Sequence, residues 1–519
     1  MQLKLGDALQ SLGRLHEAIE HYDRVLELNP NCSEAHNNRG VALLNLGDSS
    51  EAVASFERAV AINPAYADAL RNLGVANFQR GNADEAVAAH QRVIGLNPAD
   101  VAALTGLGDA LKLLGQRDAA VSAYRSAIGI DDSSSQLHNK LGLGLHERGQ
   151  TDEAIDCLRR AVQCESNRAD GHGNLGAALL AEGRIEDALD CFEQAIGIDP
   201  DYVDARFNRG LARLLTGDWA RGWADYESRR QLSRINVRDF PQPLWDGSPL
   251  NGRTILLHAE QGLGDTLQFV RYASLVRQRG GRVLLLAPKP LLPLLKLAGG
   301  YDHIVSDLNS LPPFDVHAPL LSLPGILRTT LNSVPAAIPY LAANEELTAL
   351  WRERLQEVGG LRVGINWQGD PNNHMDRTRS IPLKQFAPLA EVVGVSVISL
   401  QKWPGSEQMA EVASQFDVVH LGDTVDETAG AFMDTAAILQ SLDLVITSDT
   451  SIAHLAGGLG VPVWVALSFV PEWRWLLERD DSPWYPTMRL FRQPQPGDWP
   501  GLFADMRITL SQLVGETIV

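Results

Sequence analysis

The stretch Thr254–Tyr272 reads TILLHAEQGLGDTLQFVRY and contains the pattern that decides the fold of the second half of the chain. An apolar run ends at a glycine-containing segment, and apolar residues return at helical spacing from Leu267, which predicts a strand, a loop and a helix. In α/β folds such a loop usually holds a phosphate, but Leu267 replaces the third glycine of the dinucleotide fingerprint. Asp265 stands at the helix entrance, where its carboxylate would repel a pyrophosphate. Either Asp265 caps the helix or the loop holds another group.

Short apolar runs alternate with helical segments on both sides of residue 342, which predicts parallel sheets in two Rossmann-like α/β domains. We place the first domain at residues 240–342 and the second at residues 343–519, with the last helix a candidate to return to the first domain. Ligands of such a pair bind in the cleft outside the carboxyl ends of the strands. The predicted strands are TILLHAE, RVLLLAP, HIVSD, DVHAPL, RVGINWQ, VSVISLQ, DVVHLG, LDLVITS and VPVWVAL.

The first part of the chain, residues 1–235, is a repeat array with a period of 34 residues. Its glycines recur at positions 13, 47, 81, 115, 149, 183 and 217. This is the tetratricopeptide pattern, in which helical hairpins pack on their neighbours and form an all-α superhelix with a concave groove. The last of about seven copies carries Trp219, Trp223 and Tyr226, which enlarge its apolar face. We expect this face to dock onto the α/β part.

One position of the first repeat helix is often asparagine, at Asn38, Asn72, Asn174 and Asn208. One interpretation is that asparagine is simply common there. The other is a ladder of amides on the groove wall that binds an extended peptide backbone without reading its sequence. Gly106 interrupts the series, and so does a lysine in the next copy.

Composition excludes several classes of protein. The chain has 45 Lys and Arg against 64 Asp and Glu, a net charge of −19, so a nucleic-acid partner is not expected. Its four cysteines form no CxxC pair, so we expect neither zinc nor a disulfide framework, and a reducing compartment fits. We expect neither a signal peptide nor a membrane-spanning stretch. A cytoplasmic protein without a metal or other cofactor is the expectation.

Three loops after predicted strands carry candidate site residues. The loop QGLGD contributes Gln261, Gly262, Gly264 and Asp265; the loop QGDPNNHMDRTRSIPL contributes Arg377 and Arg379; the loop SDTSIAHLAGGLG contributes Asp449, Thr450, Ser451 and His454. Hydroxyls and free amides at a helix entrance suit a diphosphate, and an arginine adds a bidentate contact. The alternatives are an ordinary N-cap in the third loop, a satisfied structural histidine, and arginines paired with Asp370 or Asp376.

These three loops resemble those of the heptosyltransferases, bacterial glycosyltransferases with the GT-B fold. The segment DLVITSDTSIAHLAGGLGVPVWVALSFVPEWRWLLERDDSPWYPTMRLFRQ is similar to the version joined to tetratricopeptide repeats. The layout of repeats followed by GT-B also resembles the protein O-linked N-acetylglucosamine transferases. The fold that we expect is therefore an all-α tetratricopeptide superhelix followed by an α/β GT-B fold.

The resemblance implies inverting, metal-independent transfer of a sugar from a nucleotide diphosphate sugar. Asp265 matches the family's proposed base, and Asp449, Thr450 and His454 match its diphosphate-side motif. Ser451 replaces the glycine often found there, and either Arg379 or Arg377 replaces the family's cationic phosphate contact. Gln401 and Lys402 would approach the nucleoside.

The favoured hypothesis is a transferase whose repeats select a protein or peptide acceptor, with homo-oligomers through the repeats as an option. Its rival is a non-catalytic scaffold whose GT-B half binds a nucleotide sugar weakly or not at all and serves assembly. A third hypothesis, transfer to a glycan or lipid-linked acceptor, is disfavoured because no basic amphipathic segment is present.

Overall fold

The computed structural model describes residues 1–235, 238–372, 376–402 and 404–517. It divides into two compact units, the first with Met1–Leu179 and Gln194–Pro200 and the second with Leu180–Glu193 and Asp201–Val519. Each unit is described by itself.

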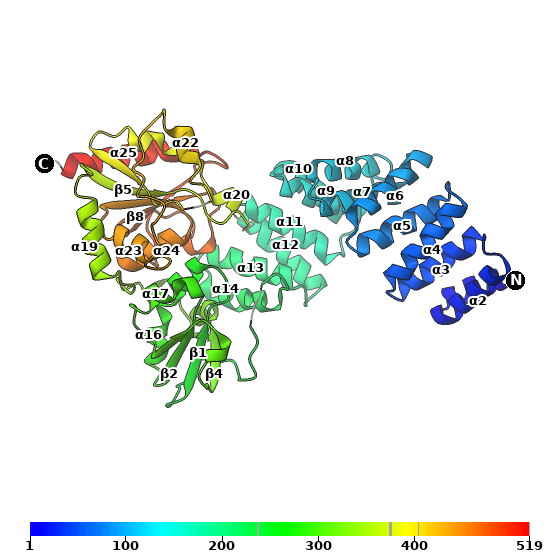
Figure 1. The fold of residues 1–519 in the computed structure, drawn as a ribbon, viewed down its shortest axis with the longest axis horizontal. Coiled ribbons are helices and arrows are strands. Elements are labelled where there is room, and N and C mark those ends of the chain that lie inside the picture. Colours follow the sequence, from blue (N-terminus) through cyan, green and yellow to red (C-terminus); the bar gives the residue numbers. More distant parts are fainter. Residues whose placement is uncertain (236–237, 373–375, 403, 518–519) are drawn as a thin grey trace. The chain divides into compact units, whose positions relative to one another are not determined.

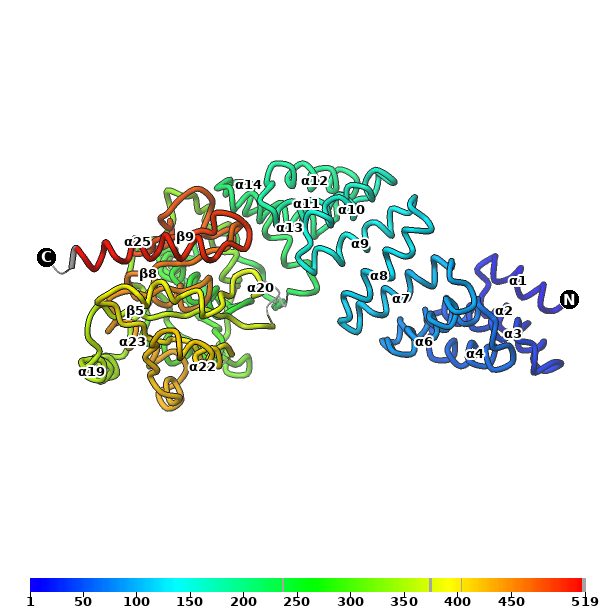
Figure 2. The backbone as a smooth tube through the Cα atoms, turned by 90° about the horizontal axis from the view of Figure 1, so that it is seen from above, coloured from blue at the N-terminus to red at the C-terminus, as the bar shows by residue number. Residues whose placement is uncertain are grey.

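The first unit is built from helical hairpins that lie side by side in chain order (Figures 1 and 2). At the hairpin turns the glycines have positive φ, for example 74° at Gly13 and 86° at Gly47, as the 34-residue period predicts. A Cβ atom at Gly40 would lie 2.6 Å from the ring of Phe56, so the paired helices need a glycine at their crossing. The helices, the last two of which continue into the second unit, are α1 (Gln2–Ser11), α2 (Leu15–Leu28), α3 (Ser33–Asn45), α4 (Ser49–Ile62), α5 (Ala67–Gln79), α6 (Ala83–Leu96), α7 (Val101–Leu113), α8 (Arg117–Ile128), α9 (Ser135–Glu147), α10 (Thr151–Cys164), α11 (Ala169–Ala181) and α12 (Ile185–Ile198).

The second unit contains two parallel sheets, and we call the first sheet with its helices the first lobe. Its strand order is β3-β2-β1-β4. The stretch Thr254–Tyr272 forms a strand, a loop and a helix, as predicted. The elements of this lobe are β1 (Thr254–His258), α15 (Leu263–Phe269), α16 (Tyr272–Arg277), β2 (Arg282–Leu286), α17 (Leu292–Leu295), β3 (His303–Val305), β4 (Val316–Pro319) and α18 (Leu323–Ile326).

The second lobe has five parallel strands in the order β6-β5-β7-β8-β9. Its last helix, α25, packs against α21 and β9 of the same lobe rather than forming a cover for the first lobe. The elements are α19 (Glu345–Arg354), β5 (Leu361–Asn366), α20 (Asp376–Arg379), α21 (Ala387–Ala390), β6 (Val395–Ser399), α22 (Gln408–Val412), α23 (Met433–Leu439), β7 (Leu444–Ser448), α24 (Ser451–Leu459), β8 (Val463–Leu467), β9 (Met488–Arg492) and α25 (Trp499–Thr517).

Two strand assignments differ from expectation. The run DVVHLG at 417–422 pairs with the edge strand β6 only through an isolated bridge between Val419 and Ile398. The chain then turns at Gly422, whose φ is 94°, so no further ladder forms. Conversely, Met488–Arg492 forms the edge strand β9, although its sequence MRLFR has no continuous apolar run. The outer side of this edge strand has only an isolated bridge between Asp481 and Arg489, and edge strands tolerate such charged side chains.

The last repeat packs into the core of the second unit. It comprises α13 (Val203–Leu215), α14 (Trp219–Tyr226) and the short helix η1 (Glu227–Gln231). Trp219 stacks on Trp484 at a centroid distance of 5.4 Å, and Trp223 meets Trp473 edge to face at 5.3 Å. The expected docking face is therefore confirmed.

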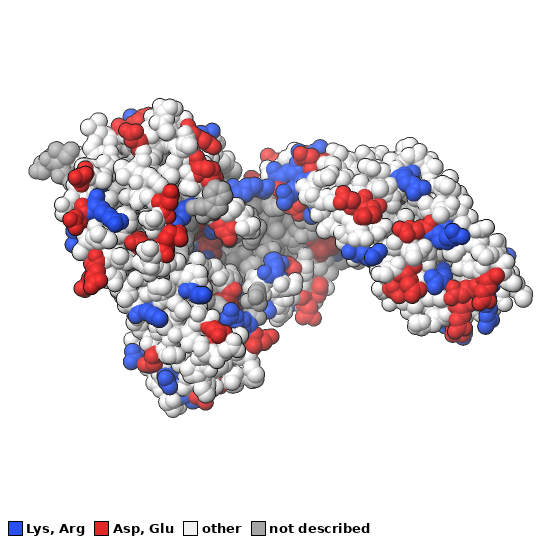
Figure 3. Space-filling model, viewed as in Figure 1, with Lys and Arg blue, Asp and Glu red and all other residues white. Residues whose placement is uncertain are grey.

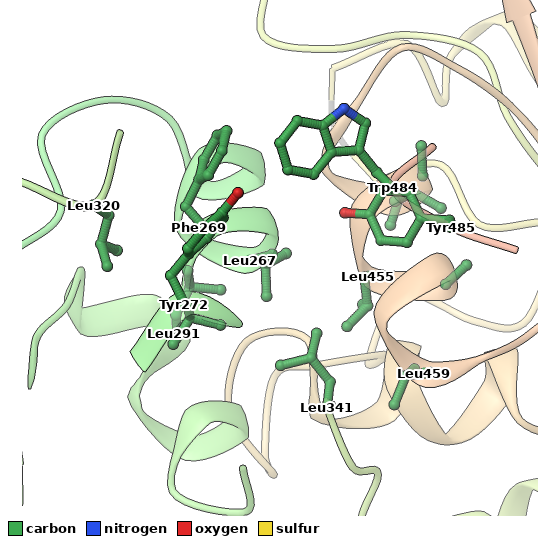
Figure 4. Close-up of a cluster of buried hydrophobic side chains, with 14 of the residues drawn as sticks. Leu267, Phe269, Tyr272, Leu291, Leu320, Leu341, Leu455, Leu459, Trp484 and Tyr485 are labelled. Atoms are coloured by element: carbon green, nitrogen blue, oxygen red, sulfur yellow. The ribbon is translucent and has the colours of Figure 1, made fainter. Parts of the chain in front are cut away.

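The same core joins the two lobes. In Figure 4, Leu267, Phe269 and Tyr272 of the first lobe face Leu455 and Trp484 of the second. Every tryptophan of the chain lies at or after Trp219. The lobes are therefore held by buried aromatic and aliphatic contact.

Acidic and basic side chains are interspersed on the face drawn in Figure 3. Within the described residues, no helix is both long and apolar enough to cross a membrane.

Candidate active site

A cleft of about 1020 Å³ lies between the two lobes and brings most of the predicted site residues together. The first lobe contributes the β1–α15 loop, and the second contributes the loops that follow β5, β6, β7 and β8. Arg377 is not among the described residues that line the cleft. The predicted residues that do line it are Gln261, Gly262, Gly264, Asp265, Arg379, Gln401, Lys402, Asp449, Thr450, Ser451 and His454.

Asp265 is the third residue of α15 and contributes to the cap of this helix, as one of the two interpretations predicts. Its Oδ2 accepts a hydrogen bond from the backbone N–H of Gly262, 2.8 Å away, so it helps to satisfy the first turn of the helix. Its Oδ1 is paired with the guanidinium of Arg474 across the cleft. The side chain is 19% exposed, so it is still open to the cleft.

Arg474 and Glu472, which the sequence interpretation did not single out, complete this charged cluster. They lie within and beside the short helix η7 (Trp473–Trp475) and belong to the segment PEWRW. Arg474 pairs with both Glu472 and Asp265, its Nε donates to Gln268 Oε1 at 2.5 Å, and its guanidinium lies over the ring of Trp473. Two charged residues inside a run of tryptophans are the signal that could have identified them.

Burial raises the pKa of Glu472 to about 7, opposed by the guanidinium of Arg474 and assisted by the carboxylate of Asp449. The cluster thus holds one carboxylate of each lobe on a single guanidinium. A carboxylate whose pKa lies near neutrality can exchange a proton at physiological pH.

The entrance of α24 has no side-chain cap. Thr450 occupies the N-cap position, yet no side-chain hydrogen bond caps the helix there. Its hydroxyl instead donates to Asn366 Oδ1 at 2.8 Å, and Thr447 donates to the same oxygen at 3.3 Å. The ordinary N-cap alternative is therefore wrong for Thr450. The first amides of a nine-residue helix open to the cleft, where the partial positive end of the helix attracts an anion.

Arg379 supplies a cation to the same wall. Its guanidinium lies so close to Gly369 that a Cβ atom there would meet Nη2 at 2.9 Å. Arg379 also pairs loosely with Asp376, at 3.6 Å between Nε and Oδ1, as the alternative for this loop predicts. Burial raises the pKa of Asp449, and the charge of Arg379 opposes that rise. An arginine, a half-buried aspartate and free helix amides therefore share one region.

His454 lies one turn inside α24 and is a well-packed side chain. Its Nδ1 is 3.0 Å from the hydroxyl of Tyr485, and its ring stacks on Trp475 at 5.5 Å. Burial, with Arg474 as a second cause, holds the pKa of His454 well below its usual range, so the ring is neutral. A Cβ atom at Gly264 would lie 3.0 Å from the ring, which is why the β1–α15 loop needs glycine there. His454 thus has the structural role considered as an alternative and also lines the cleft.

Gln401 holds loops together rather than presenting its amide to the cleft. Its Oε1 accepts hydrogen bonds from Asn366 Nδ2 at 2.8 Å and from two backbone amides, and its Nε2 donates to three backbone carbonyls. Lys402 donates to the carbonyl of Val425 and to Glu427. Because its amide is already used, the predicted contact of Gln401 with a nucleoside would have to be indirect.

The repeat asparagines connect neighbouring hairpins. Asn38 donates to Asp7 at 2.9 Å, Asn72 to Asn37 at 3.0 Å and Asn174 to Asn139 at 3.0 Å. At least one donor of each amide is therefore used within the array. Asn208, on α13 in the second unit, is half-buried.

Gly106 interrupts this series for a steric reason. A Cβ atom at Gly106 would lie 2.4 Å from Nε2 of His90, and one at Gly74 would lie 2.6 Å from the same ring. His90 stands where other copies have Tyr22, Phe56 or Tyr124. Its ring occupies the place that a larger side chain at 106 would need.

Among the residues that the structure describes, no three His, Cys, Asp or Glu side chains are grouped so that they could hold a metal ion.

Comparison with known proteins identifies the repeats. A family model described as tetratricopeptide repeat matches residues 3–67, 42–101 and 105–172, and one described as TPR repeat matches residues 177–217. The first part of the chain consists of tetratricopeptide repeats. Protein FlbA of Caulobacter vibrioides is 26% identical over 308 residues, which cover 55% of this chain and 51% of that protein. The chain thus spans about half of the length of this relative.

Several solved structures are similar to part of the chain. MamA is 30% identical, with 31% of this chain and 94% of that chain covered and a TM-score of 0.30. A thermophilic TPR protein of Thermus thermophilus is 25% identical, with 36% of this chain and 100% of that chain covered and a TM-score of 0.31.

Proposed function

We propose that the chain is an inverting glycosyltransferase of the GT-B type that moves a sugar from a nucleotide diphosphate sugar to a hydroxyl of a polypeptide held by the repeats. One observation carries the proposal: a single cleft has a carboxylate on one wall and uncapped helix amides with an arginine on the other. The two walls match the needs of the two substrates. The acceptor loses a proton, which a carboxylate can take, and the donor loses an anion, which amides and an arginine can bind.

The transfer would proceed by attack of the acceptor oxygen on the anomeric carbon. The bond from that carbon to the diphosphate oxygen breaks, and its electron pair leaves with the nucleotide diphosphate. Asp265 accepts the hydroxyl proton. The leaving anion gains charge beside the first amides of α24 and Arg379, where such groups stabilise it most.

The pairing of Asp265 with Arg474 has a consequence for this step. Because this cation already engages the carboxylate, positioning of the two substrates must supply much of the rate. Effective molarity can contribute about 7–11 kcal/mol to such a reaction. The closely packed lobes, which meet at Gly264 and His454, favour fixed positions for both substrates.

A thermal-shift screen of the full chain with nucleoside diphosphates tests the proposal. One nucleotide should stabilise the protein, by about 2.7 kcal/mol at a hundred times its dissociation constant. Arg379→Ala should remove most of that shift, whereas Arg362→Ala, which breaks a pair with Asp443 outside the cleft lining, should keep it. If no nucleotide shifts the wild-type protein, the rival hypothesis of a non-catalytic scaffold replaces the enzyme.

A further inference from the structure

Phe432 is the one phenylalanine, tyrosine or tryptophan among the described residues that line the cleft. It immediately precedes α23 and is half-buried, so part of its ring is packed and part is open to the cleft. Gly430, two residues before it, approaches the first lobe, since a Cβ atom there would lie 2.9 Å from Pro293. The ring therefore provides a flat aromatic surface beside lining residues such as Lys402, Glu427 and Thr435.

The backbone at Phe432 is in the left-handed region, with φ 65° and ψ 1°. A bulky side chain rarely adopts this conformation, and such residues persist only where the surrounding structure holds them. Residue 432 would be less strained as glycine, but glycine would remove the ring. The chain therefore keeps a phenylalanine at a backbone position that favours glycine, and this residue lines the cleft.

A set of hydrogen bonds holds the segment in place. Asp426, which also has a positive φ of 62°, accepts from the backbone N–H of Thr435 at 3.0 Å and from its hydroxyl at 2.5 Å. Asp434 accepts from the N–H of Asp426 at 2.9 Å and from the indole N–H of Trp351 at 2.7 Å. Both ends of the segment 426–435 are therefore tied to each other and to α19, and the ring of Phe432 has a defined position.

Polar residues line the same part of the second lobe as Phe432. Lys402, Glu427 and Thr435 line both the cleft and an adjoining hollow of about 230 Å³. That hollow also has the side chains of Ser399, Ser406 and His420 in its wall. A flat apolar face beside a ring of donors and acceptors suits an aromatic heterocycle with polar edges.

We propose that Phe432 is the stacking platform for the nucleobase of the donor, with the polar edge of the base turned toward the adjoining hollow. This inference rests on the proposed function and adds the residue that binds the base. It divides the second lobe between two tasks: the α24 entrance with Arg379 binds the diphosphate, and the 426–435 segment binds the base. Stacking of a base on an aromatic side chain corresponds to about 5- to 150-fold in affinity.

Calorimetry on the full chain with two probes tests this division. The probes are the nucleoside diphosphate that stabilises the wild type most and inorganic pyrophosphate, which has no base. Phe432→Leu should weaken the nucleotide about 5- to 150-fold and leave pyrophosphate within about twofold. Phe432→Trp, which keeps an aromatic face, should retain most of the nucleotide affinity. Phe416→Leu, at a half-buried phenylalanine outside the cleft lining, is the matched control and should change neither.

Unchanged nucleotide affinity in Phe432→Leu would overturn the inference, and so would an equal loss for both probes. Absence of nucleotide binding in the wild type would instead remove the proposed function itself, so the two failures are distinguishable.

Discussion

The carboxylate of Asp265 in the first lobe is paired with the guanidinium of Arg474 in the second lobe, and the same guanidinium also binds Glu472. One cation thus connects the two lobes inside the cleft. The side chain of Arg474 is only 9% exposed. Removing it would leave two carboxylates close together with little access to water.

Arg474→Met should therefore destabilise the second unit by about 3–5 kcal/mol, the range typical of a buried ion pair that loses one partner. Tryptophan fluorescence during denaturant unfolding reports this unit alone, because all tryptophans lie at or after Trp219. Arg479→Met breaks the more exposed pair with Asp481 and should cost no more than about 1 kcal/mol. Equal losses of unfolding free energy in the two variants would contradict a special role of Arg474 as the buried cation between the lobes.

Asp265→Asn should abolish sugar transfer while nucleotide affinity stays within a few-fold. The amide keeps the shape of the side chain but cannot take the acceptor's proton. Transfer is measured by release of the nucleoside diphosphate, and affinity by calorimetry. Asp370→Asn changes another carboxylate of the cleft lining and should leave turnover largely intact. Turnover in Asp265→Asn would show that another group is the base.

A chain that begins at Leu180 should fold its tryptophan-containing unit cooperatively, whereas one that begins at Leu232 should not. The second cut removes Trp219 and Trp223 from the core. It also removes Arg229, whose buried guanidinium pairs with Glu260 at 2.7 Å, both side chains being 0% exposed. Circular dichroism and fluorescence melts distinguish the two fragments, and a cooperative melt of the shorter one would contradict the structure.

Acid should weaken the repeat array through His90. Burial lowers the pKa of His90 from 6.5 to about 4, so between these values the unfolded chain binds the proton more strongly. The contribution of neutral His90 to the stability of the array is thus fully present above pH 6.5 and falls as the pH drops toward 4. At about 1.4 kcal/mol per pKa unit, the loss is at most about 3 kcal/mol.

The helical signal at 222 nm, compared with tryptophan fluorescence, isolates this transition, because the first unit has no tryptophan. His90→Phe should remove most of the acid sensitivity if its ring fits beside Gly106. His16→Gln, at an exposed histidine, should leave the sensitivity unchanged.

Local patterns in the sequence predicted much of the architecture. The 34-residue period placed the hairpin turns, and apolar runs located eight of the nine strands in the part of the chain that the structure describes. The run 417–422 and β9 were misassigned, because pairing at a sheet edge depends on neighbours rather than on a strand's own pattern. The loops of Asp265, Arg379 and Thr450 were predicted together, because ligands of paired α/β domains bind in the cleft outside the carboxyl ends of the strands of both sheets.

The partners of these residues could not be predicted in the same way. Arg474 lies 209 positions from Asp265, and nothing in either local segment indicates the pair. The side-chain amide of Asn366 hydrogen-bonds to both Gln401 and Thr450. These contacts likewise depend on how three strands align. Side-chain chemistry thus identified candidates, and tertiary geometry decided their roles.

The insertion of Trp219, Trp223 and Arg229 into the core of the second unit separates the final repeat from the others in evolutionary terms. Hairpins upstream of Leu180 contact mainly their neighbours, so duplication or deletion there changes the length of the array and little else. The final copy, in contrast, cannot be lost without opening the core of the unit that holds the cleft. Across descendants of such a gene, array length would drift at the N-terminal side, while the last hairpin would vary as slowly as the lobes themselves.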